Sequence, residues 1–130
     1  MLIHLDLEAS DPIYNQLKNQ IIAGIAKGEL VPGERLPSVR ALAQDLGINL
    51  HTVNKAYQQL KQDGFILIHR QKGVVVQPDG FPEADEEYWQ GLQKTLHPLI
   101  AEAVCRGIKR EEFVDLCSEI FKEFEKQGGK

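Results

Sequence analysis

The feature that most constrains this chain is a pair of short amphipathic stretches joined by a few residues around Gly47. In each stretch the apolar residues recur at the i, i+3, i+4 spacing that builds one face of an α-helix. These positions are Val39, Leu42, Ala43 and Leu46, then Val53, Ala56, Tyr57 and Leu60. Ser38 is a favourable N-cap for the first helix, and Gly47 stands where the end of that helix favours a left-handed residue. Two helices with so short a connection predict a helix-turn-helix.

Further elements are expected on both sides of this helix pair. The dipeptide Asp11-Pro12 is a helix start signal, with the acid as cap and the proline at the first helical position, and Gly28 ends that helix. Downstream, two β-prone runs, 65–70 and 74–77, flank a turn that contains a glycine. The predicted fold class is mainly α with a small β-hairpin. It is a winged helix-turn-helix followed by a short C-terminal two-helix segment.

A composition change near residue 80 predicts a domain boundary. Residues 78–82 read PDGFP, which is typical of a linker. The expected domains are residues 1–78, which hold the winged helix-turn-helix, and residues 82–130, which hold the helical segment.

The helical segment carries more apolar surface than two helices can bury against each other. Amphipathic patterns cover 83–107 and 109–126, and Pro98 removes one hydrogen bond from the first, which should kink or split it. The excess apolar surface must meet the first domain or another chain. The residues expected to form a dimer contact are Leu96, Phe113, Leu116, Ile120, Phe121 and Phe124. The alternative is a monomer whose stripe packs back on its own first domain.

Composition excludes several classes of protein. The chain has 130 residues, of which 42% are hydrophobic and 26% charged, as expected for a globular domain with a small appendage. It lacks an apolar run of about 18 residues and a basic signal-peptide start, so we expect no membrane span and a cytoplasmic location. Cys105 and Cys117 fall within apolar helical patterns, which favours reduced, core-filling thiols over a disulfide. The four histidines show no ligand spacing with them, so neither metal nor cofactor is expected.

The net charge of −4 conceals a division along the chain. Residues 35–77 hold six basic and two acidic residues, a net charge of +4, whereas residues 81–130 hold seven basic and eleven acidic residues, a net charge of −4. This asymmetry indicates a cationic surface carried on an acidic body, which suits a nucleic-acid partner. Charge alone is also compatible with two ordinary solvated faces.

The leading end of the second helix of the pair is polar. It carries Asn49, His51, Thr52, Asn54 and Lys55. In a helix-turn-helix the second helix enters the DNA major groove, and its N-terminal residues meet base edges. Asn can bridge adenine, and Thr can contact the thymine methyl group. Capping alone would explain Asn49, but it leaves the other polar residues and the cationic segment unexplained, so the pattern favours DNA contact.

The run from Pro12 to Val76 resembles the DNA-binding domain of GntR-type bacterial transcription regulators. The resemblance lies in two specific stretches, GELVPGERLPSVRALA and TVNKAYQQLKQDGFI, and it covers about half of the chain. The short acidic tail is similar to that of the YtrA-like subfamily, whose members add a brief two-helix segment in place of a large effector domain.

The resemblance implies DNA-binding roles at three places. Three residues, Arg35, Ser38 and Arg40, would contact DNA from the first helix of the pair and the loop before it, with Arg40 as the principal anchor. The polar residues at the start of the second helix of the pair would face the groove; these are Asn49, His51, Thr52, Asn54 and Lys55. The tip of the wing would be formed by Arg70, Gln71 and Lys72.

This chain departs from the family pattern at two of these places. Relatives often have Asn-Pro-Asn or Ser-Arg-Asn before Thr-Val, whereas this chain has Leu50 at the central position, which cannot make an arginine contact. The wing of relatives usually reads Arg-Gly-x-Gly, whereas here Gln71 stands at the first glycine. Base preference and the approach of the wing to the minor groove are therefore open.

The resemblance implies a sequence-specific transcription regulator, in the commoner case a repressor, that binds an inverted-repeat DNA operator as a homodimer. The sequence specifies neither the operator nor a small-molecule effector. An enzyme is not expected, because the sequence has no nucleophile elbow, phosphate-binding glycine loop or clustered carboxylates. A second hypothesis is a winged helix that serves as a protein-interaction module, with its basic face simply solvated.

Overall fold

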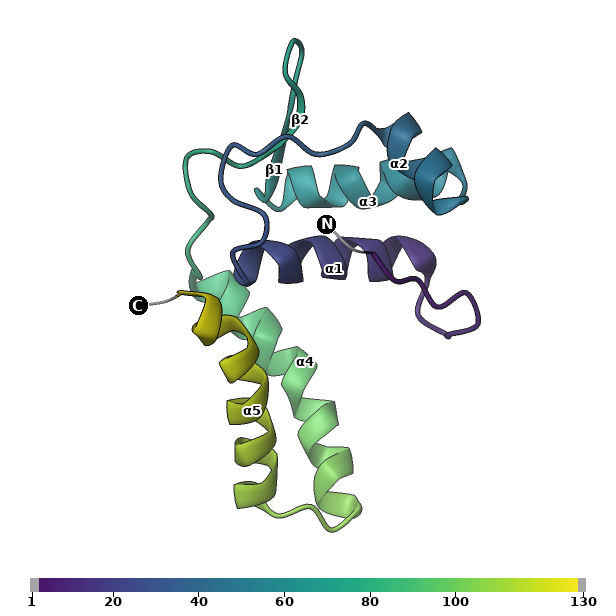
Figure 1. Ribbon diagram of the computed structural model, residues 1–130. Coiled ribbons are helices and arrows are strands. Elements are labelled where there is room, and N and C mark those ends of the chain that lie inside the picture. Colours follow the sequence, from purple (N-terminus) through teal and green to yellow (C-terminus); the bar gives the residue numbers. More distant parts are fainter. Residues whose placement is uncertain (1–2, 129–130) are drawn as a thin grey trace. The chain divides into compact units, whose positions relative to one another are not determined.

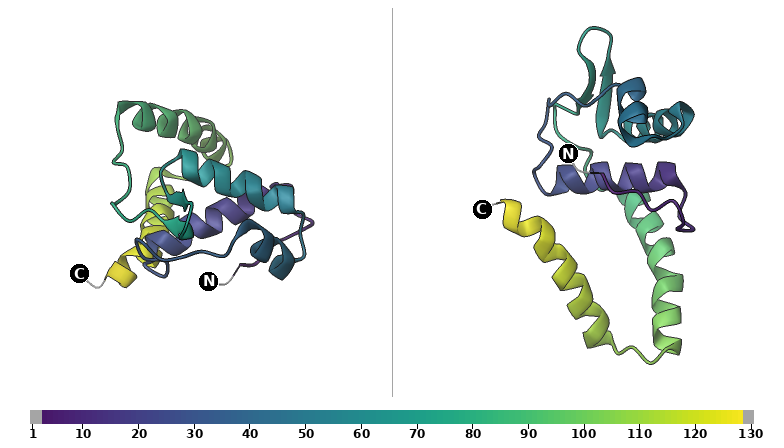
Figure 2. Two further views of the ribbon diagram at one scale, coloured as in Figure 1. Left: turned by 90° about the horizontal axis from the view of Figure 1, so that it is seen from above. Right: turned by 45° about the vertical axis from the view of Figure 1, so that its right-hand side comes forward.

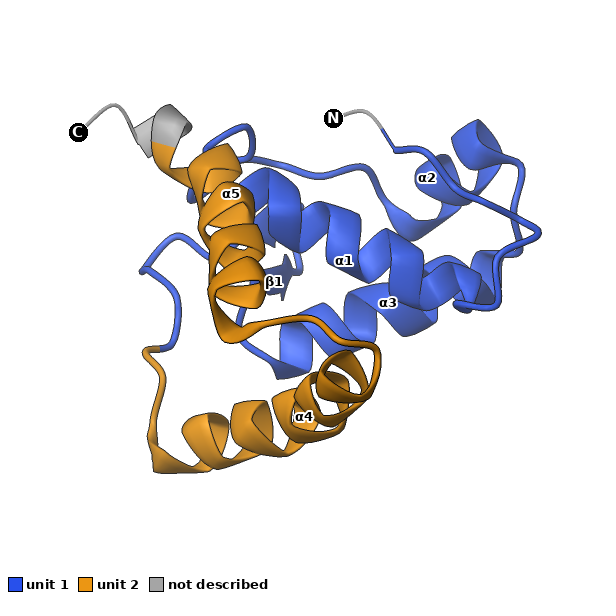
Figure 3. Cartoon of the chain, turned by 90° about the horizontal axis from the view of Figure 1, so that it is seen from below, with its two compact units in different colours: residues 1–82 blue, residues 83–130 orange. Residues whose placement is uncertain are grey.

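The computed structural model describes residues 3–128 and contains five α-helices and one β-hairpin in that range (Figure 1). The elements are α1 (Ile13–Ala26), α2 (Val39–Leu46), α3 (Leu50–Gln62), β1 (Ile66–His69), β2 (Gly73–Val76), α4 (Glu86–Cys105) and α5 (Arg110–Gly128). They form two compact units, unit 1 (Met1–Pro82) and unit 2 (Glu83–Lys130), shown in separate colours in Figure 3. The predicted fold class is confirmed.

Helix α3 is the centre of unit 1, because it packs against α1, α2 and β1. The stripe predicted for α3 is buried along its whole length, from Val53 to Leu60. In α2 the side chains of Leu42 and Ala43 are buried and those of the other two predicted positions are partly buried. Burying a large aliphatic side chain contributes about 1.5–3 kcal/mol, so this shared core holds the helix pair together.

Two side chains and one glycine fix the connection between α2 and α3. The Ser38 hydroxyl oxygen accepts a hydrogen bond from the Ala41 amide at 3.0 Å at the start of α2. Gly47 ends α2 in the left-handed region, with φ 67°, and the next amide, that of Ile48, donates to the Ala43 carbonyl at 3.1 Å. Asn49 then caps α3. The turn is therefore closed by hydrogen bonds at both ends, which sets the angle between the helices.

The wing is a two-stranded hairpin that a further segment joins at one edge. Strands β1 and β2 are antiparallel, with Ile66 opposite Val76 and His69 opposite Gly73. Residues 33–36, which precede α2, pair with the other edge of β2: the Leu36 amide donates to the Val74 carbonyl at 2.8 Å, and Arg35 forms an isolated bridge with Val75. The loop before α2 is thus joined to the base of the hairpin.

One boundary prediction in unit 1 is wrong, namely the start of α1. Pro12 is the N-cap of α1, since its carbonyl accepts from the Gln16 amide at 3.1 Å, and the Asp11 carboxylate instead accepts from the Asn15 side chain. The expected linker also contributes to unit 1, because the Phe81 ring lies 5.9 Å from that of Phe65 and packs against the core. Burying the apolar surface of the Phe81 ring stabilises this position, which an exposed linker would not do.

Two predictions in unit 2 are also wrong, namely a split of the helix at Pro98 and a core position for Cys105. Helix α4 continues through Pro98 as one helix. At roughly 100° per residue, Pro98 lies opposite Trp89, so the carbonyl that loses its helical partner faces water. Cys105 does not fill a core, because it is the exposed last residue of α4, while Cys117 is half-buried.

Unit 2 is an open helix pair. Beyond Gly107, which has φ 83°, the helices diverge (Figure 2) and lack the close packing that α3 makes with α1 and α2. Among the described side chains of unit 2, Ala103 alone is buried. The large apolar side chains left exposed include Tyr88, Trp89, Leu99, Ile100, Val104, Val114, Leu116, Ile120 and Phe121. Neither these helices nor the others in residues 3–128 combine the length and apolarity that crossing a bilayer requires.

Candidate nucleic-acid interface

All the residues predicted to bind DNA lie in unit 1, on the start of α2 and the loop before it, the first turns of α3, and the wing tip. Thr52 is half-buried and the others are exposed, namely Arg35, Ser38, Arg40, Asn49, His51, Asn54, Lys55, Arg70, Gln71 and Lys72. The core packing of unit 1 therefore leaves these side chains available to a partner.

Helix α3 separates its core face from its polar face. With Val53 and Leu60 buried, a spacing of roughly 100° per residue places His51, Lys55 and Gln58 on the opposite side, with Asn54 at its flank. Gln58 is exposed and was not predicted as a site residue, although its position one turn beyond Asn54 was visible in the sequence. Its carboxamide can read adenine as an asparagine does.

Asn49 can cap α3 and still offer a hydrogen-bond donor to DNA. Its Oδ1 accepts from the His51 amide at 2.7 Å, so the carboxamide oxygen is used in capping α3. The amide NH2 group still has two donor hydrogens. Ser38 is similar, since its hydroxyl oxygen caps α2 and its hydrogen can still donate. Both caps hold the start of a helix while offering a donor to an anion.

Lys55 is held by a residue from another helix. Its ammonium nitrogen lies 4.0 Å from the centre of the Tyr14 ring, a cation–π contact between α3 and α1. The sequence does not reveal this role of Tyr14, because the two residues are far apart in the chain and Tyr14 fits the apolar stripe of α1. The ring limits the freedom of the long lysine side chain before any partner binds.

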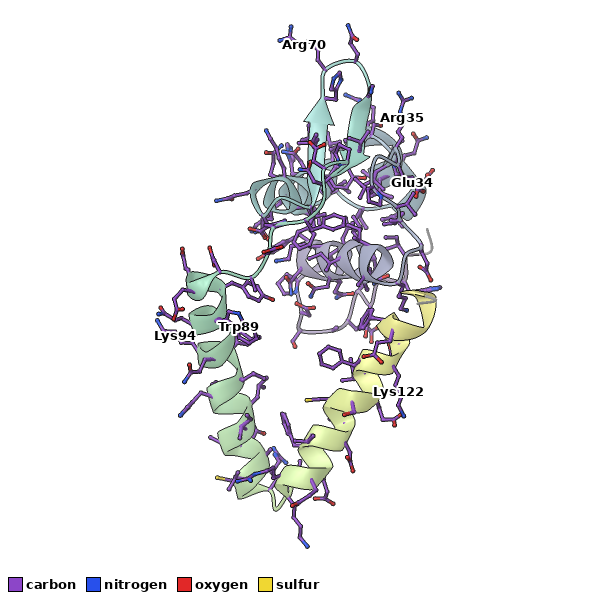
Figure 4. The ribbon with its side chains drawn as sticks, turned by 90° about the vertical axis from the view of Figure 1, so that its left-hand side faces the viewer. Glu34, Arg35, Arg70, Trp89, Lys94 and Lys122 are labelled. Atoms are coloured by element: carbon purple, nitrogen blue, oxygen red, sulfur yellow. The ribbon has the colours of Figure 1, made fainter. Side chains whose placement is uncertain are left out.

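Arg35 and Arg70 lie on the wing sheet at different heights. Figure 4 shows Arg70 at the tip of the hairpin and Arg35 nearer its base. The pairing of Arg35 with Val75 accounts for this position. The cations of the wing therefore come from two segments that are separate in the sequence, with Arg35 from the loop before α2 and Arg70 from the hairpin.

The wing tip is a tight turn of Arg70, Gln71 and Lys72 between the paired residues His69 and Gly73. The His69 ring nitrogen Nδ1 accepts from the amides of Gln71 and Lys72, each at 3.1 Å. Gly73 is the left-handed residue, with φ 78°, and within residues 3–128 no other residue type has a positive φ. Gln71 thus adopts an ordinary backbone conformation without a positive φ.

The cations of unit 1 are not neutralised by neighbouring acids. Within residues 3–128 the ion pairs are Arg106 with Glu102 at 2.8 Å and Lys122 with Glu119 at 3.1 Å, both in unit 2. The six basic residues of 35–77 therefore keep their charge for an external anion, as binding to DNA phosphate requires.

Tyr57 links the core to the start of α2. Its hydroxyl donates to the Pro37 carbonyl at 2.8 Å, immediately before the cap residue Ser38. Burial raises the pKa of the Tyr57 phenol far above its usual value, so this group remains a neutral donor. The segment that carries Ser38 and Arg40 is fixed to α3 by this bond.

The residues predicted for dimerisation all lie in unit 2. Leu96 is half-buried on α4, and on α5 the side chains of Phe113 and Phe124 are also half-buried. Leu116, Ile120 and Phe121 are exposed by 57%, 47% and 63%, so their apolar faces are not covered. Figure 4 shows Trp89 on the side of α4 that faces α5, whereas Lys94 and Lys122 point outward.

Comparison with known proteins gives a consistent result. Residues 13–76 match the family described as bacterial regulatory proteins, gntR family. The HTH-type transcriptional repressor YtrA of Bacillus subtilis is 33% identical over 129 residues, covering 99% of this chain and 98% of the repressor.

Two solved structures extend the similarity to the three-dimensional fold. A transcriptional antiterminator from Listeria monocytogenes superposes with a TM-score of 0.86 at 28% identity, over 92% of this chain and 90% of that one. YtrA from Sulfolobus acidocaldarius, a GntR-family transcription factor, is 40% identical over 95% of this chain and 99% of its own, with a TM-score of 0.56. The protein described here belongs to the GntR family of DNA-binding transcription regulators, which are not enzymes.

Proposed function

We propose that this protein is a transcriptional repressor that binds an inverted-repeat operator as a homodimer and acts in the cytoplasm, where it binds the chromosome. The observation that carries the proposal is the unpaired cationic and polar surface that α2, α3 and the wing present on unit 1. Family membership supports DNA as the partner, and the name of the Bacillus subtilis relative supports repression.

Helix α3 enters the major groove in this proposal. Its exposed face presents His51, Asn54 and Gln58 to base edges, and Thr52 lies at the edge of that face. These side chains donate and accept hydrogen bonds, which is what distinguishes base pairs in the major groove. Leu50 is 39% exposed at the same end of α3, where it can contact a thymine methyl group but cannot donate to guanine.

The remaining residues contact the DNA backbone. Arg40 lies in the first turn of α2, beside the Ser38 cap, where a charged side chain and free helix amides can meet one phosphate. Lys72 at the wing tip is a flexible point charge suited to phosphate rather than to a particular base. These contacts position α3 and supply most of the salt-dependent affinity.

The apolar faces of unit 2 support a dimer. On α4 the apolar side chains from Tyr88 to Val104 cover about 160° of the helix circumference, and on α5 those from Phe113 to Phe124 cover about the same. A helix with one neighbour needs a stripe of about 100°. Each helix therefore has apolar surface for two neighbours, and the second copy of the chain supplies the missing one. A two-fold axis would then place both α3 helices on related half-sites.

The test begins with DNA selected from a random-sequence pool by the purified protein, followed by mobility shifts with the selected duplex. Arg40→Ala should weaken binding by about 1–3 kcal/mol, and the parent's affinity should fall steeply with salt. The matched control is Lys94→Ala, which removes one exposed cation from unit 2 and should bind as the parent does.

Unchanged affinity in a folded Arg40→Ala protein would contradict the assigned interface. Failure to enrich any sequence would favour the alternative of a protein-interaction module.

A further inference from the structure

His69 occupies a position in the wing that the DNA-contact residues leave unexplained. It is the last residue of β1 and is exposed, yet its ring does not simply project into solvent. The Nδ1 atom accepts the amides of both Gln71 and Lys72 at 3.1 Å. An acceptor at Nδ1 means that the neutral ring carries its proton on Nε2.

These two hydrogen bonds solve a local problem of the turn. A three-residue hairpin loop leaves amides directed into the loop, and it uses one left-handed residue, here Gly73, to rejoin the strands. Glycine in place of Gln71 would give the turn a second flexible position, but this chain has a side chain there. The ring of His69 satisfies the inward amides and thereby restricts the backbone of the residues that carry the tip's side chains.

We propose that His69 is a positioning residue for DNA recognition: its Nδ1 fixes the turn so that Arg70, Gln71 and Lys72 are held ready for the DNA backbone. The inference rests on the proposed function, since it concerns how the wing of this regulator meets its operator. An ordered turn loses less conformational entropy on binding, and the effect reaches DNA through these three residues rather than through the histidine itself.

Two substitutions separate positioning from direct contact. In His69→Asn the carboxamide oxygen can take the place of Nδ1 and accept the same amides, but the Nε2 donor is lost. In His69→Phe the ring is kept and the acceptor is lost. With the selected duplex as probe, affinity should stay within about twofold in His69→Asn and fall roughly three- to tenfold in His69→Phe. In a Lys72→Ala background the effect of His69→Phe should shrink, because part of the machinery it positions is gone.

A second readout follows the turn in the free protein. Amide hydrogen exchange, measured by NMR, should accelerate at Gln71 and Lys72 in His69→Phe and remain slow in His69→Asn. Thermal unfolding should be unchanged in both, since His69 lies outside the buried core. This readout does not depend on DNA.

The outcomes are distinct. Equal loss of affinity in both variants would overturn positioning and assign direct contact to the imidazole. Normal amide protection in His69→Phe would show that His69 does not hold the turn. Lost protection with unchanged affinity would show that holding the turn has no role in DNA recognition. If Arg40→Ala also left affinity unchanged, the failure would belong to the proposed function, and amide exchange would still decide whether His69 holds the turn.

Discussion

Units 1 and 2 are both largely helical, but they use apolar side chains in opposite ways. In unit 1 the large side chains of Leu17, Ile21, Tyr57 and Leu60 are fully buried around α3. In unit 2 the α4 and α5 helices diverge, and Phe121 is 63% exposed. The first unit has an internal apolar core, whereas the second has apolar surface that its own residues do not cover.

This difference separates two requirements of the protein. Reading a half-site needs a rigid module, and unit 1 supplies it within one chain. In the proposed dimer, recognising a longer operator needs two such modules joined, and the uncovered apolar surface of unit 2 would form that joint. Substitutions of similar chemistry should therefore have different consequences in the two units.

The largest effect is expected from Phe121→Asp. A carboxylate in an apolar seam cannot be satisfied there, so the variant should be a folded monomer. Losing the second half-site should weaken operator binding by roughly 10²–10⁴-fold. Light scattering measures the mass and mobility shifts measure the affinity. Lys122→Asp is the control on the outward side of α5 and should remain dimeric. A parent protein that is monomeric at micromolar concentration and still binds its operator tightly would refute the dimer.

A core truncation in unit 1 should have the next largest effect. Leu60 is fully buried, so Leu60→Ala should lower the free energy of unfolding by about 2–5 kcal/mol in urea titrations. The matched change in unit 2 is Leu116→Ala at a side chain that is 57% exposed, and it should change dimer dissociation more than the stability of either unit. Equal losses of stability in the two variants would remove the distinction between the units.

Sequence preference should reside in unit 1 alone. Selection with Phe121→Asp should return the parent's half-site without its two-fold repeat. Thr52→Ala should change the preferred bases, with about 1–3 kcal/mol of discrimination lost, whereas Lys72→Ala should weaken all sequences alike. Sequencing of the selected DNA measures both effects. If Thr52→Ala returned the same consensus as Lys72→Ala and the parent, α3 and the wing would not divide the work in this way.

The smallest effect is expected from Tyr57→Phe, which removes the bond to Pro37 and leaves the ring. Stability near neutral pH should fall by about 0.5–1.5 kcal/mol. Because burial raises the pKa of Tyr57, its neutral form favours folding below the unfolded-state pKa of about 10, and this advantage is lost as pH rises above it. Urea unfolding at pH 8 and pH 10.5 should therefore show the gap between parent and variant narrowing. A gap that stays constant would mean that folding does not raise the pKa of Tyr57, and the absence of any gap would mean that the phenol does not stabilise this segment.

Periodicity was sufficient to predict the helix pair and the hairpin. The stripes of α2 and α3 lie within single helices, and the Gly47 turn joins neighbours in the chain, so local pattern determines both. The cap at Ser38 was predicted for the same reason. The predicted start of α1 is one residue too early, because the Asp11-Pro12 pair is compatible with either residue as the N-cap. The structure has Pro12 in that position.

The contacts that complete the interface could not be predicted. The pairing of residues 33–36 with β2 and the contact of Tyr14 with Lys55 join segments far apart in the chain, and no periodic pattern records them. The two hydrogen bonds to His69 are local, but they depend on a side-chain torsion that the residue type does not fix. Cys105 was misassigned because apolar neighbours in sequence need not share its side of α4.

The pairing of Arg35 with Val75 also limits how this regulator can diverge. A substitution that shifts β2 will move the loop that leads to Arg40 as well, so a change at the hairpin base alters two groups of the proposed DNA-contact residues in one step. His51 and Gln58 have no such link, because they project from the exposed side of a helix that the core already holds. New operator preferences should therefore arise in lineages by replacement along α3, while the wing and the start of α2 change together or not at all.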